Sequence, residues 1–484
     1  MKQLIIYLLI LSHITIFAQE KPKWDVNNPP GNFKEVSFTT NEGTWMNVDV
    51  SPDGSMIAFD MLGDIYTMPI SGGTATAIRT GLAWEVQPRW SPDGKKILFT
   101  SDSAGGDNIF YMDVDGKNVK QITKESFRLL NNAVWMPDGQ YIIARKHFTS
   151  GRSLGAGEMW MYHISGGEGI QLTKRKNDQQ DVNEPTISPD GKMLYYSEDV
   201  YPGGYFQYNK DPNSEIFVIN SYNIETGETK RVTGGPGGSC RPQISNKGDK
   251  IAYVRRVREK SVLYIYEIST GREWAIYDQL SKDQQEAWTV FGIYTGFDWM
   301  PDDKEIVIWA KGKIVKINIA DKKATDIPFT VNAKHKLMET VQFENKACEE
   351  NFDVKVLRNA VTSPDGSQLV FSALGSLYVS KNGQTPVRLT TGTDFEAEPQ
   401  FNAKGDQIVY VTWDDESLGK IQTYNFATKK STAVTKDPAI YRTPSFSPDG
   451  AQIVYRKEGG NGHQGYQYNT NSGIYTADVN GENA

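Results

Sequence analysis

The chain has 484 residues, of which 38% are hydrophobic and 11% aromatic, a composition typical of globular rather than disordered proteins. Its formal net charge of −7 at pH 7 argues against a general nucleic-acid-binding surface, so no nucleic-acid partner is expected. Cys240 and Cys348 are the only two cysteines, and we expect two buried or unpaired thiols rather than a disulfide.

Residues 1–18 have the pattern of a secretory signal. Lys2 precedes an apolar run at 4–11, and Ala18 is followed by polar residues. A charged start, a short apolar segment and a small residue at the cleavage point are the parts of such a signal. The run is short for a membrane span, so an uncleaved anchor is the less favoured alternative. We therefore predict an exported chain, periplasmic or secreted, without a membrane span after cleavage.

Residues 19–39 form an N-terminal segment before the first repeat. A strand is expected at 34–40, and its sequence resembles residues 325–330. One of these two segments is expected to supply an outer strand that closes a ring. The sequence leaves open which sheet it joins.

From residue 40 onward, one phrase recurs: a β-rich segment, a Pro-Asp-Gly turn and an apolar strand. In Ser51-Pro52-Asp53-Gly54, Pro presets φ and Gly supplies the left-handed residue that closes a hairpin. Six copies end at Gly54, Gly94, Gly139, Gly191, Gly366 and Gly450, and three variants of the phrase end at Gly248, Asp303 and Gly405. Spacings of 39 to 63 residues are typical of a repeat architecture.

Each repeat predicts a four-stranded antiparallel unit. After the first hairpin, strands are expected at 65–70 and 74–79, separated by the turn Gly72-Gly73. Four antiparallel strands per unit indicate an all-β fold built as a β-propeller. Only residues 278–290 show apolar spacing that suits a helix.

Nine blades exceed the four to eight that usually close one ring. We therefore predict a six-bladed propeller over 40–330, a linker over 331–353 and three blades of a second, incomplete propeller over 354–484. The sequence ends where the last strand of the ninth blade is expected. Because open blades expose sheet edges, we expect the chain to be the N-terminal part of a longer polypeptide.

Three long insertions occur at 146–157, 199–214 and 458–472, each between the second and third strand of a blade. Such connections leave the blade at the end opposite the Pro-Asp-Gly turns. The candidate recognition residues in them are Arg152, Tyr201, Tyr205, Phe206, Tyr208, Tyr466 and Tyr468. Aromatic loops are typical of recognition surfaces, although loops that fold back over their own blades are the alternative.

Motifs for catalysis are weak in this chain. Its five histidines, His13, His147, His163, His335 and His463, are scattered without His-x-His spacing, so no metal site is expected. Gly151-Arg152-Ser153-Leu154-Gly155 has the spacing of a nucleophile elbow, but an antiparallel blade lacks the strand-to-helix turn that such a serine requires. No catalytic or metal-binding residue is assigned.

The repeats resemble TolB-type propeller repeats, which also occur in tricorn protease and the prolyl oligopeptidase group. A closer resemblance is to the propeller region of exported bacterial amidohydrolases. It lies in Glu-Gly-Thr-Trp at 42–45, Asp-Met-Leu-Gly-Asp-Ile-Tyr at 60–66, Gln-Pro-Arg-Trp-Ser-Pro-Asp-Gly at 87–94, Ser-Asp-Ser-Ala-Gly-Gly-Asp-Asn at 101–108 and Val-Thr-Trp-Asp-Asp-Glu at 411–416.

This resemblance implies an exported scaffold that binds, positions or gates a peptide or small-molecule substrate for a downstream metal-dependent hydrolase domain. The divalent metal and its ligands are expected only in that domain. One alternative is a TolB-like envelope protein that binds protein partners without chemistry. The other is the propeller of a serine peptidase of the prolyl oligopeptidase kind. Whether the chain is part of an enzyme stays open at this point.

Overall fold

The computed structural model describes residues 24–149, 155–201, 210–287, 289–339, 348–459 and 471–483. These residues form strands, turns and irregular segments, and no helix occurs among them. The predicted all-β fold is therefore confirmed. A helix able to cross a membrane is likewise absent from these ranges.

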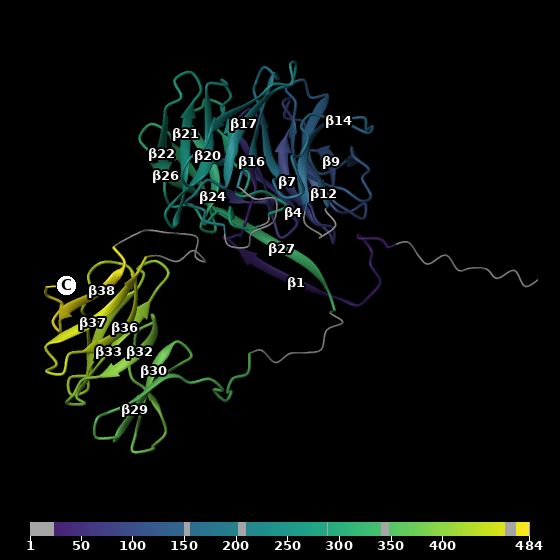
Figure 1. Ribbon diagram of the computed structural model, residues 1–484. Coiled ribbons are helices and arrows are strands. Elements are labelled where there is room, and N and C mark those ends of the chain that lie inside the picture. The colour runs from purple at the N-terminus through teal and green to yellow at the C-terminus, as the bar shows by residue number, and fades with distance from the viewer. Residues whose placement is uncertain are drawn as a thin grey trace, which may run out of the picture. The chain divides into compact units, whose positions relative to one another are not determined.

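The described strands form sheets of the predicted kind (Figure 1). Eight sheets have four strands, nearly all in chain order, and the last blade has three described strands. The sheets belong to two compact units, Met1–Leu194 with Ser245–Gly248 and Thr295–Glu339, and Tyr195–Ile244 with Asp249–Tyr294 and Thr340–Ala484. The number of blades that share one axis stays a prediction.

The first three blades lie in the first half of the chain. Blade 1 comprises β2 (Val48–Val50), β3 (Met56–Met61), β4 (Asp64–Pro69) and β6 (Thr76–Arg79). Blade 2 comprises β7 (Glu85–Trp90), β8 (Lys96–Ser101), β9 (Asn108–Asp113) and β10 (Lys120–Gln121). Blade 3 comprises β11 (Leu129–Trp135), β12 (Tyr141–Thr149), β13 (Gly155–His163) and β14 (Ile170–Gln171).

Three further blades of four strands come next in the chain. Blade 4 comprises β15 (Val182–Ile187), β16 (Met193–Asp199), β17 (Phe217–Asn223) and β18 (Thr229–Thr233). Blade 5 comprises β19 (Cys240–Ile244), β20 (Lys250–Val257), β21 (Lys260–Glu267) and β22 (Glu273–Tyr277). Blade 6 comprises β23 (Asp298–Trp299), β24 (Glu305–Ala310), β25 (Lys313–Asn318) and β26 (Ala324–Ile327).

The C-terminal part of the chain holds the last three blades. Blade 7 comprises β28 (Arg358–Thr362), β29 (Gln368–Ala373), β30 (Ser376–Lys381) and β31 (Val387–Arg388). Blade 8 comprises β32 (Phe395–Phe401), β33 (Gln407–Trp413), β34 (Lys420–Asn425) and β35 (Lys430–Ala433). Blade 9 comprises β36 (Ile440–Phe446), β37 (Gln452–Glu458) and β38 (Gly473–Asp478).

The Pro-Asp-Gly turns join the first and second strands as predicted. In blade 1 the Ser51 hydroxyl donates to Asp53 Oδ1 at 2.6 Å and accepts the Met56 N–H at 2.9 Å. Gly54 has φ 73°, the left-handed conformation that the turn requires. The same serine-to-aspartate bond recurs at Ser91, Ser188, Ser363 and Ser447. These aspartates are turn formers, which confirms their interpretation from the sequence.

The hydrophobic core lies between successive blades. Leu98 and Ile109 of blade 2 pack with Leu130 and Ile142 of blade 3 in one buried cluster. Val370 of blade 7 shares a similar cluster with other residues of blades 7 and 8. Burying such a side chain contributes about 1.5 to 3 kcal/mol, so neighbouring blades stabilise one another.

A β-bulge occurs in the first strand of blades 2, 3, 5, 7, 8 and 9, and in blades 2, 3, 5 and 9 its N–H links the strand to the preceding blade. Gln87 and Asn132 sit at these bulges with positive φ, where the strand register shifts. The Gln87 N–H donates to Asp60 Oδ2 of blade 1 at 2.7 Å, and the Asn132 N–H donates to Gln87 Oε1 at 2.8 Å. Equivalent bulges occur at Arg241, Asn359, Glu398 and Thr443. The bulge is therefore an architectural feature of the repeat.

In blade 1, the carboxylate of Asp60 accepts several of the hydrogen bonds around this bulge. Its two carboxylate oxygens accept the N–H and the side-chain amide of Asn47, each at 2.7 Å, in addition to the Gln87 N–H. Asn47 Oδ1 in turn accepts the Gly296 N–H at 2.7 Å, and the Val48 N–H donates to the Gly296 carbonyl at 2.9 Å. Blade 1 thus adjoins the chain that leads into blade 6.

Two carboxylates and one guanidinium also meet between blades 6, 1 and 2. Asp49 accepts from Arg89 Nη1 at 2.7 Å and from the Trp90 N–H at 2.6 Å. Asp298 accepts the Trp299 N–H at 2.9 Å. Burial, followed by the charge of Asp49, raises the pKa of Asp298 to about 7, although Arg89 opposes the shift.

The two segments considered for an outer, ring-closing strand have different partners in the structure. β1 (Phe33–Thr40) pairs antiparallel along its whole length with β27 (Phe329–Met338), and the two form a long ribbon in Figure 1. β27 also pairs with the short β5 (Gly73–Thr74), whereas residues 324–327 are the outer strand of blade 6. The predicted linker over 331–353 therefore begins as a strand, because β1 supplies its hydrogen-bonding partner.

The helix suggested for 278–290 is wrong for the described residues of that segment, which form irregular structure and a turn. Arg256, fully buried, holds this segment against blade 5 through Asp283 at 2.8 Å. Asp283 also accepts hydrogen bonds from Ser261 and from the Gln285 N–H. The chain wraps around the guanidinium, and that contact outweighs the weak helical periodicity.

We predict that Asp60→Ala destabilises the first unit by at least about 3 kcal/mol, since about 1 to 3 kcal/mol is lost for each buried donor left without an acceptor. Urea unfolding followed by intrinsic fluorescence measures this change. Asp326→Ala, which removes an exposed carboxylate from β26, is expected to change the free energy of unfolding by less than about 0.5 kcal/mol. Equal effects of the two substitutions would contradict the role of Asp60.

We predict that Asp298→Asn reduces the pH dependence of stability. A carboxyl whose pKa is raised to about 7 by folding contributes stability at low pH that is lost as the pH rises through about 7. The asparagine cannot ionise, so its melting temperature is expected to fall less between pH 5.5 and pH 8 than that of the wild type. Asp302→Asn is the control, because hydrogen bonds lower the pKa of Asp302 and it stays ionised over that range.

Candidate binding sites

Most of the predicted recognition residues lie outside the described part of the chain. These are Arg152, Tyr205, Phe206, Tyr208, Tyr466 and Tyr468. Tyr201, the remaining candidate, comes after β16 and is half-buried. The connection that contains it joins the second and third strands of blade 4, as the sequence predicted.

Tyr201 is held in place by its neighbours. Its N–H donates to Asp199 Oδ1 at 2.9 Å, and Lys210 Nζ lies 5.4 Å from the centre of its ring. Lys210 also pairs with Asp199 Oδ2 at 2.5 Å. The base of this insertion therefore combines an aromatic ring with a paired cation.

A larger group of cations and aromatic rings lies in blade 3, at the end opposite its Pro-Asp-Gly turn. We call it the guanidinium–aromatic cluster, and its members are Phe127, Arg128, Lys146, Phe148, Trp160 and Arg175. The guanidinium carbons of Arg128 and Arg175 lie 4.9 and 4.4 Å from the ring centre of Phe148. Lys146 Nζ lies 4.3 Å from the Trp160 ring. Such cation–π contacts contribute about 0.5 to 2 kcal/mol each.

Carboxylates compensate two of the three cations in this cluster. Lys146 pairs with Glu125 at 2.5 Å. Arg175 pairs with Glu158 at 3.2 Å and with Asp178 at 3.4 Å. Glu158 also accepts the indole N–H of Trp160 at 3.0 Å, which fixes that ring against Lys146.

A buried ion pair involves the residue of β12 that precedes Lys146 of the cluster. Arg145, on β12 just before the cluster, is fully buried and its Nη2 lies 2.6 Å from Asp181 Oδ2. Asp181 also accepts the Gly157 N–H from β13. Next to this pair, His147 is buried, and burial followed by the Arg145 charge lowers its pKa to about 4. His147 is therefore neutral at neutral pH and adds no charge to the cluster.

A raised pKa also occurs near this end of blade 2. Burial, followed by the negative charge of Asp102, raises the pKa of Asp107 to about 6, while Arg145 opposes the change. The Asp107 carbonyl accepts the Leu130 N–H at 3.0 Å, which ties blade 2 to blade 3. The carboxyl is thus close to half-protonated in mildly acidic solution.

The structure gives no support to a nucleophile elbow at residues 151–155. Ser153 lies outside the described residues, but β12 and β13 on either side pair antiparallel, with Thr149 opposite Gly155. An elbow requires a strand that turns into a helix on a parallel sheet. Within the ranges described, no three His, Cys, Asp or Glu residues gather as a metal site. Cys240 is buried and Cys348 is exposed, and the two do not form a disulfide.

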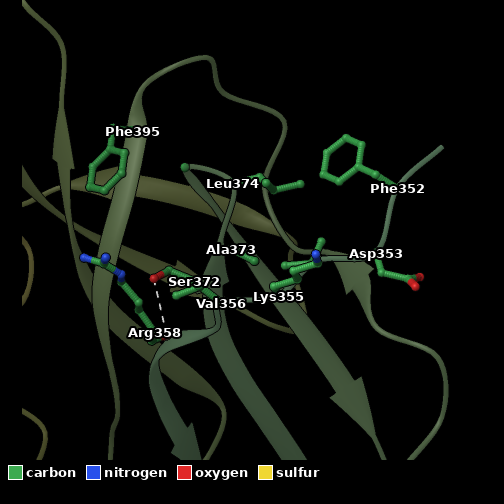
Figure 2. A pocket seen from close by; sticks show the side chains of 11 residues that line it. Phe352, Asp353, Lys355, Val356, Arg358, Ser372, Ala373, Leu374 and Phe395 are labelled. Atoms are coloured by element: carbon green, nitrogen blue, oxygen red, sulfur yellow. Dashed lines mark hydrogen bonds between the residues drawn. The ribbon is translucent and has the colours of Figure 1, made fainter. Parts of the chain in front are cut away.

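An apolar pocket of about 560 Å³ lies beside blade 7. Figure 2 shows Leu374 between Phe352 and Phe395, and these three side chains are 54% to 63% exposed. Lys355 and Arg358 bring positive charge to the lining, and Ser372 Oγ donates to the Arg358 carbonyl at 3.3 Å. The pocket can accommodate an apolar group.

Sequence reasoning did not find the pocket or two arginines of the guanidinium–aromatic cluster. Arg128 and Arg175 lie in connections that lead out of the fourth strands of blades 2 and 3, whereas the predicted recognition residues lie in the longer insertions. The alternation Phe352-x-Val354-x-Val356 was a signal for the pocket, since apolar residues in a polar linker are unusual. No sequence pattern places Arg175 beside Phe148.

Comparisons with known proteins agree with this architecture. Residues 15–206 match the family model described as TolB beta propeller domain. A Tol-Pal system protein TolB of Francisella tularensis is 26% identical over 217 residues, which cover 44% of this chain and 44% of the relative. An uncharacterized protein of Agrobacterium fabrum is 29% identical over 158 residues, covering 30% of this chain and 52% of the relative.

The crystal structure of TolB from Acinetobacter baumannii aligns with a TM-score of 0.44 and 17% identity, covering 60% of this chain and 66% of that chain. The chain spans about half or less of the length of the two curated relatives just described. The family match and the sequence relatives together show that this chain carries a TolB-like β-propeller domain.

Proposed function

We propose that this chain is the exported recognition region of an amidohydrolase-like hydrolase. In this proposal the propellers bind a peptide or protein ligand and position it for a metal-dependent catalytic domain. Support comes from the TolB-like domain and from the ordered phrases that resemble the propeller region of exported amidohydrolases. The divalent metal belongs to that catalytic domain, and no residue of this chain is assigned to it.

The difference between the two ends of the blades carries the proposal. At the turn end, Ser51 and Asp53 bind each other and the backbone, so their polar groups are already occupied. At the other end, blade 3 presents the guanidinium–aromatic cluster and blade 4 presents Tyr201. Aromatic and arginine side chains are the residues that most often anchor a protein ligand. We therefore assign recognition to the end formed by the connections between second and third strands.

A second candidate function is a TolB-like envelope protein that binds a protein partner without chemistry. The similarity to the Tol-Pal system protein TolB favours it. A third is the propeller of a prolyl-oligopeptidase-type peptidase, and the similarity to an uncharacterized peptidase of Bacillus subtilis, 26% identical over 190 residues, favours it. Each candidate keeps the same recognition end, and the three differ in the domain expected after the propellers.

The reading frame downstream of residue 484 distinguishes these functions. A strand followed by His-x-His supports the amidohydrolase, and a stop codon supports the TolB-like protein. A Gly-x-Ser-x-Gly elbow within an α/β-hydrolase domain supports the peptidase.

We predict that a photo-crosslinking residue at position 201 captures a ligand in the living cell. Tyr201→p-benzoylphenylalanine places the reactive group at the recognition end of blade 4, just after β16. Lys192→p-benzoylphenylalanine places it at the exposed turn that precedes β16. Mass spectrometry of the adducts is expected to find a discrete product for position 201 and none for position 192. Adducts of equal yield at both positions would show that ligand recognition is not specific to the end of the blades that carries Tyr201.

We predict that the mature protein begins at or near Gln19, because residues 1–18 have the three parts of a secretory signal. Mass spectrometry of the intact protein from its native host measures the N-terminus. A membrane-bound protein that retains Met1 would show that the segment is an anchor.

A further inference from the structure

We propose that Arg128 binds a carboxylate of an acidic peptide, and that an apolar side chain next to this carboxylate packs on Phe127. This inference rests on the proposed recognition function and names the chemistry of its ligand. It concerns the guanidinium–aromatic cluster of blade 3.

Arg128 is the one cation of the cluster without a carboxylate partner among the described residues. Lys146 and Arg175 each have one within 3.2 Å. Arg128 makes no ion pair and no hydrogen bond with any described residue. Its charge is therefore available to an anion from outside the chain.

Two aromatic rings contact the guanidinium of Arg128. Its guanidinium carbon lies 4.4 Å from the ring centre of Phe127 and 4.9 Å from that of Phe148. A guanidinium held in this way loses little conformational entropy when it binds, because its orientation is set before the ligand arrives. Arg128 is thus preorganised for a planar anion.

One edge of the guanidinium is open. Nη1 is buried and has no hydrogen-bond partner, whereas Nε and Nη2 are not among the buried atoms that lack one. Because these two nitrogens also have no described partner, they are accessible at the surface. A carboxylate can accept two parallel hydrogen bonds from such an edge.

The surroundings favour a carboxylate beside an apolar group. The guanidinium of Arg175, although paired with Glu158, contacts the same Phe148 ring as Arg128, so a second cation lies close to the proposed carboxylate. Phe127 is 70% exposed, and a ligand that covers it gains hydrophobic free energy. Inorganic phosphate would leave Phe127 uncovered. An Asp, a Glu or a C-terminal carboxylate next to an aliphatic or aromatic residue satisfies both features.

A random dodecapeptide phage library tests the inference on the whole chain. Peptides are selected on the wild type and depleted on Arg128→Ala, and the survivors are synthesised. Fluorescence anisotropy then measures their Kd for the wild type, Arg128→Lys, Arg128→Ala and Lys95→Ala. Lys95 is the matched control, because it removes one exposed positive charge from the turn end of blade 2. Circular dichroism checks that each variant is folded.

We expect the selected peptides to combine an acidic residue with a neighbouring apolar one. Loss of a bidentate, charge-assisted contact is expected to raise Kd about 10- to 100-fold in Arg128→Ala. Arg128→Lys keeps the positive charge but not the planar pair of N–H donors, so a smaller rise in Kd of about 5-fold is expected. Lys95→Ala is expected to stay within about 2-fold of the wild type.

Three outcomes would overturn the inference. The first is that the library yields no acidic peptides. The second is that peptides bind Arg128→Ala as tightly as the wild type; if position 201 still captures a ligand, the proposed function stands and only the role of Arg128 is lost. The third is that millimolar phosphate displaces the peptides while acetate does not, which would assign the site to another oxyanion.

Discussion

The blades depend on one recurring hydrogen bond, in which the bulge N–H of one blade is accepted by a side chain of the blade before it. Asp60, Gln87 and Ser197 each accept such a bond, from Gln87, Asn132 and Arg241 respectively. Each bulge residue has a positive φ that a non-glycine residue adopts only at a cost in free energy. The bond offsets that cost and satisfies a buried donor. It also fixes the register of neighbouring sheets, which hydrophobic contact alone leaves free.

This linkage makes the two ends of a blade different. The turn end is constrained, because in five of the turns the Ser and Asp side chains bind each other and a left-handed Gly closes the turn. Asp303 is an exception, because it has a positive φ at the turn position where glycine is usual. Its carboxylate accepts the N–H groups of Asn246 and Lys247, and these hydrogen bonds stabilise the turn. At the opposite end, connections vary in length from blade to blade. Function is therefore free to concentrate there, as it does on loops positioned by a rigid scaffold.

The cation-rich end of blade 3 shows how a charged cluster is assembled without a ligand motif. Arg145 and Asp181 form a buried pair whose members are costly to separate, and this pair anchors β12 to the chain beyond β14. The strand then presents Lys146 and Phe148 beyond the pair. Arg128 and Arg175 reach the same ring from connections about 50 residues apart in the sequence. The scaffold is rigid, while the side chains that face outward come from separate connections.

The sequence by itself determined the all-β fold, the four-stranded blade and the position of every Pro-Asp-Gly turn, because these are set by local rules of φ and of apolar alternation. It also located the long connections between second and third strands. Tertiary structure decided the rest. β27 is a strand because β1, about 300 residues earlier, pairs with it. The helix suggested for 278–290 does not form, and the buried pair of Arg256 and Asp283 holds that segment against blade 5 instead. The rings that contact Arg128 and the pocket beside Leu374 could not be predicted from the sequence either. Both arise from contacts between segments that no local sequence pattern connects.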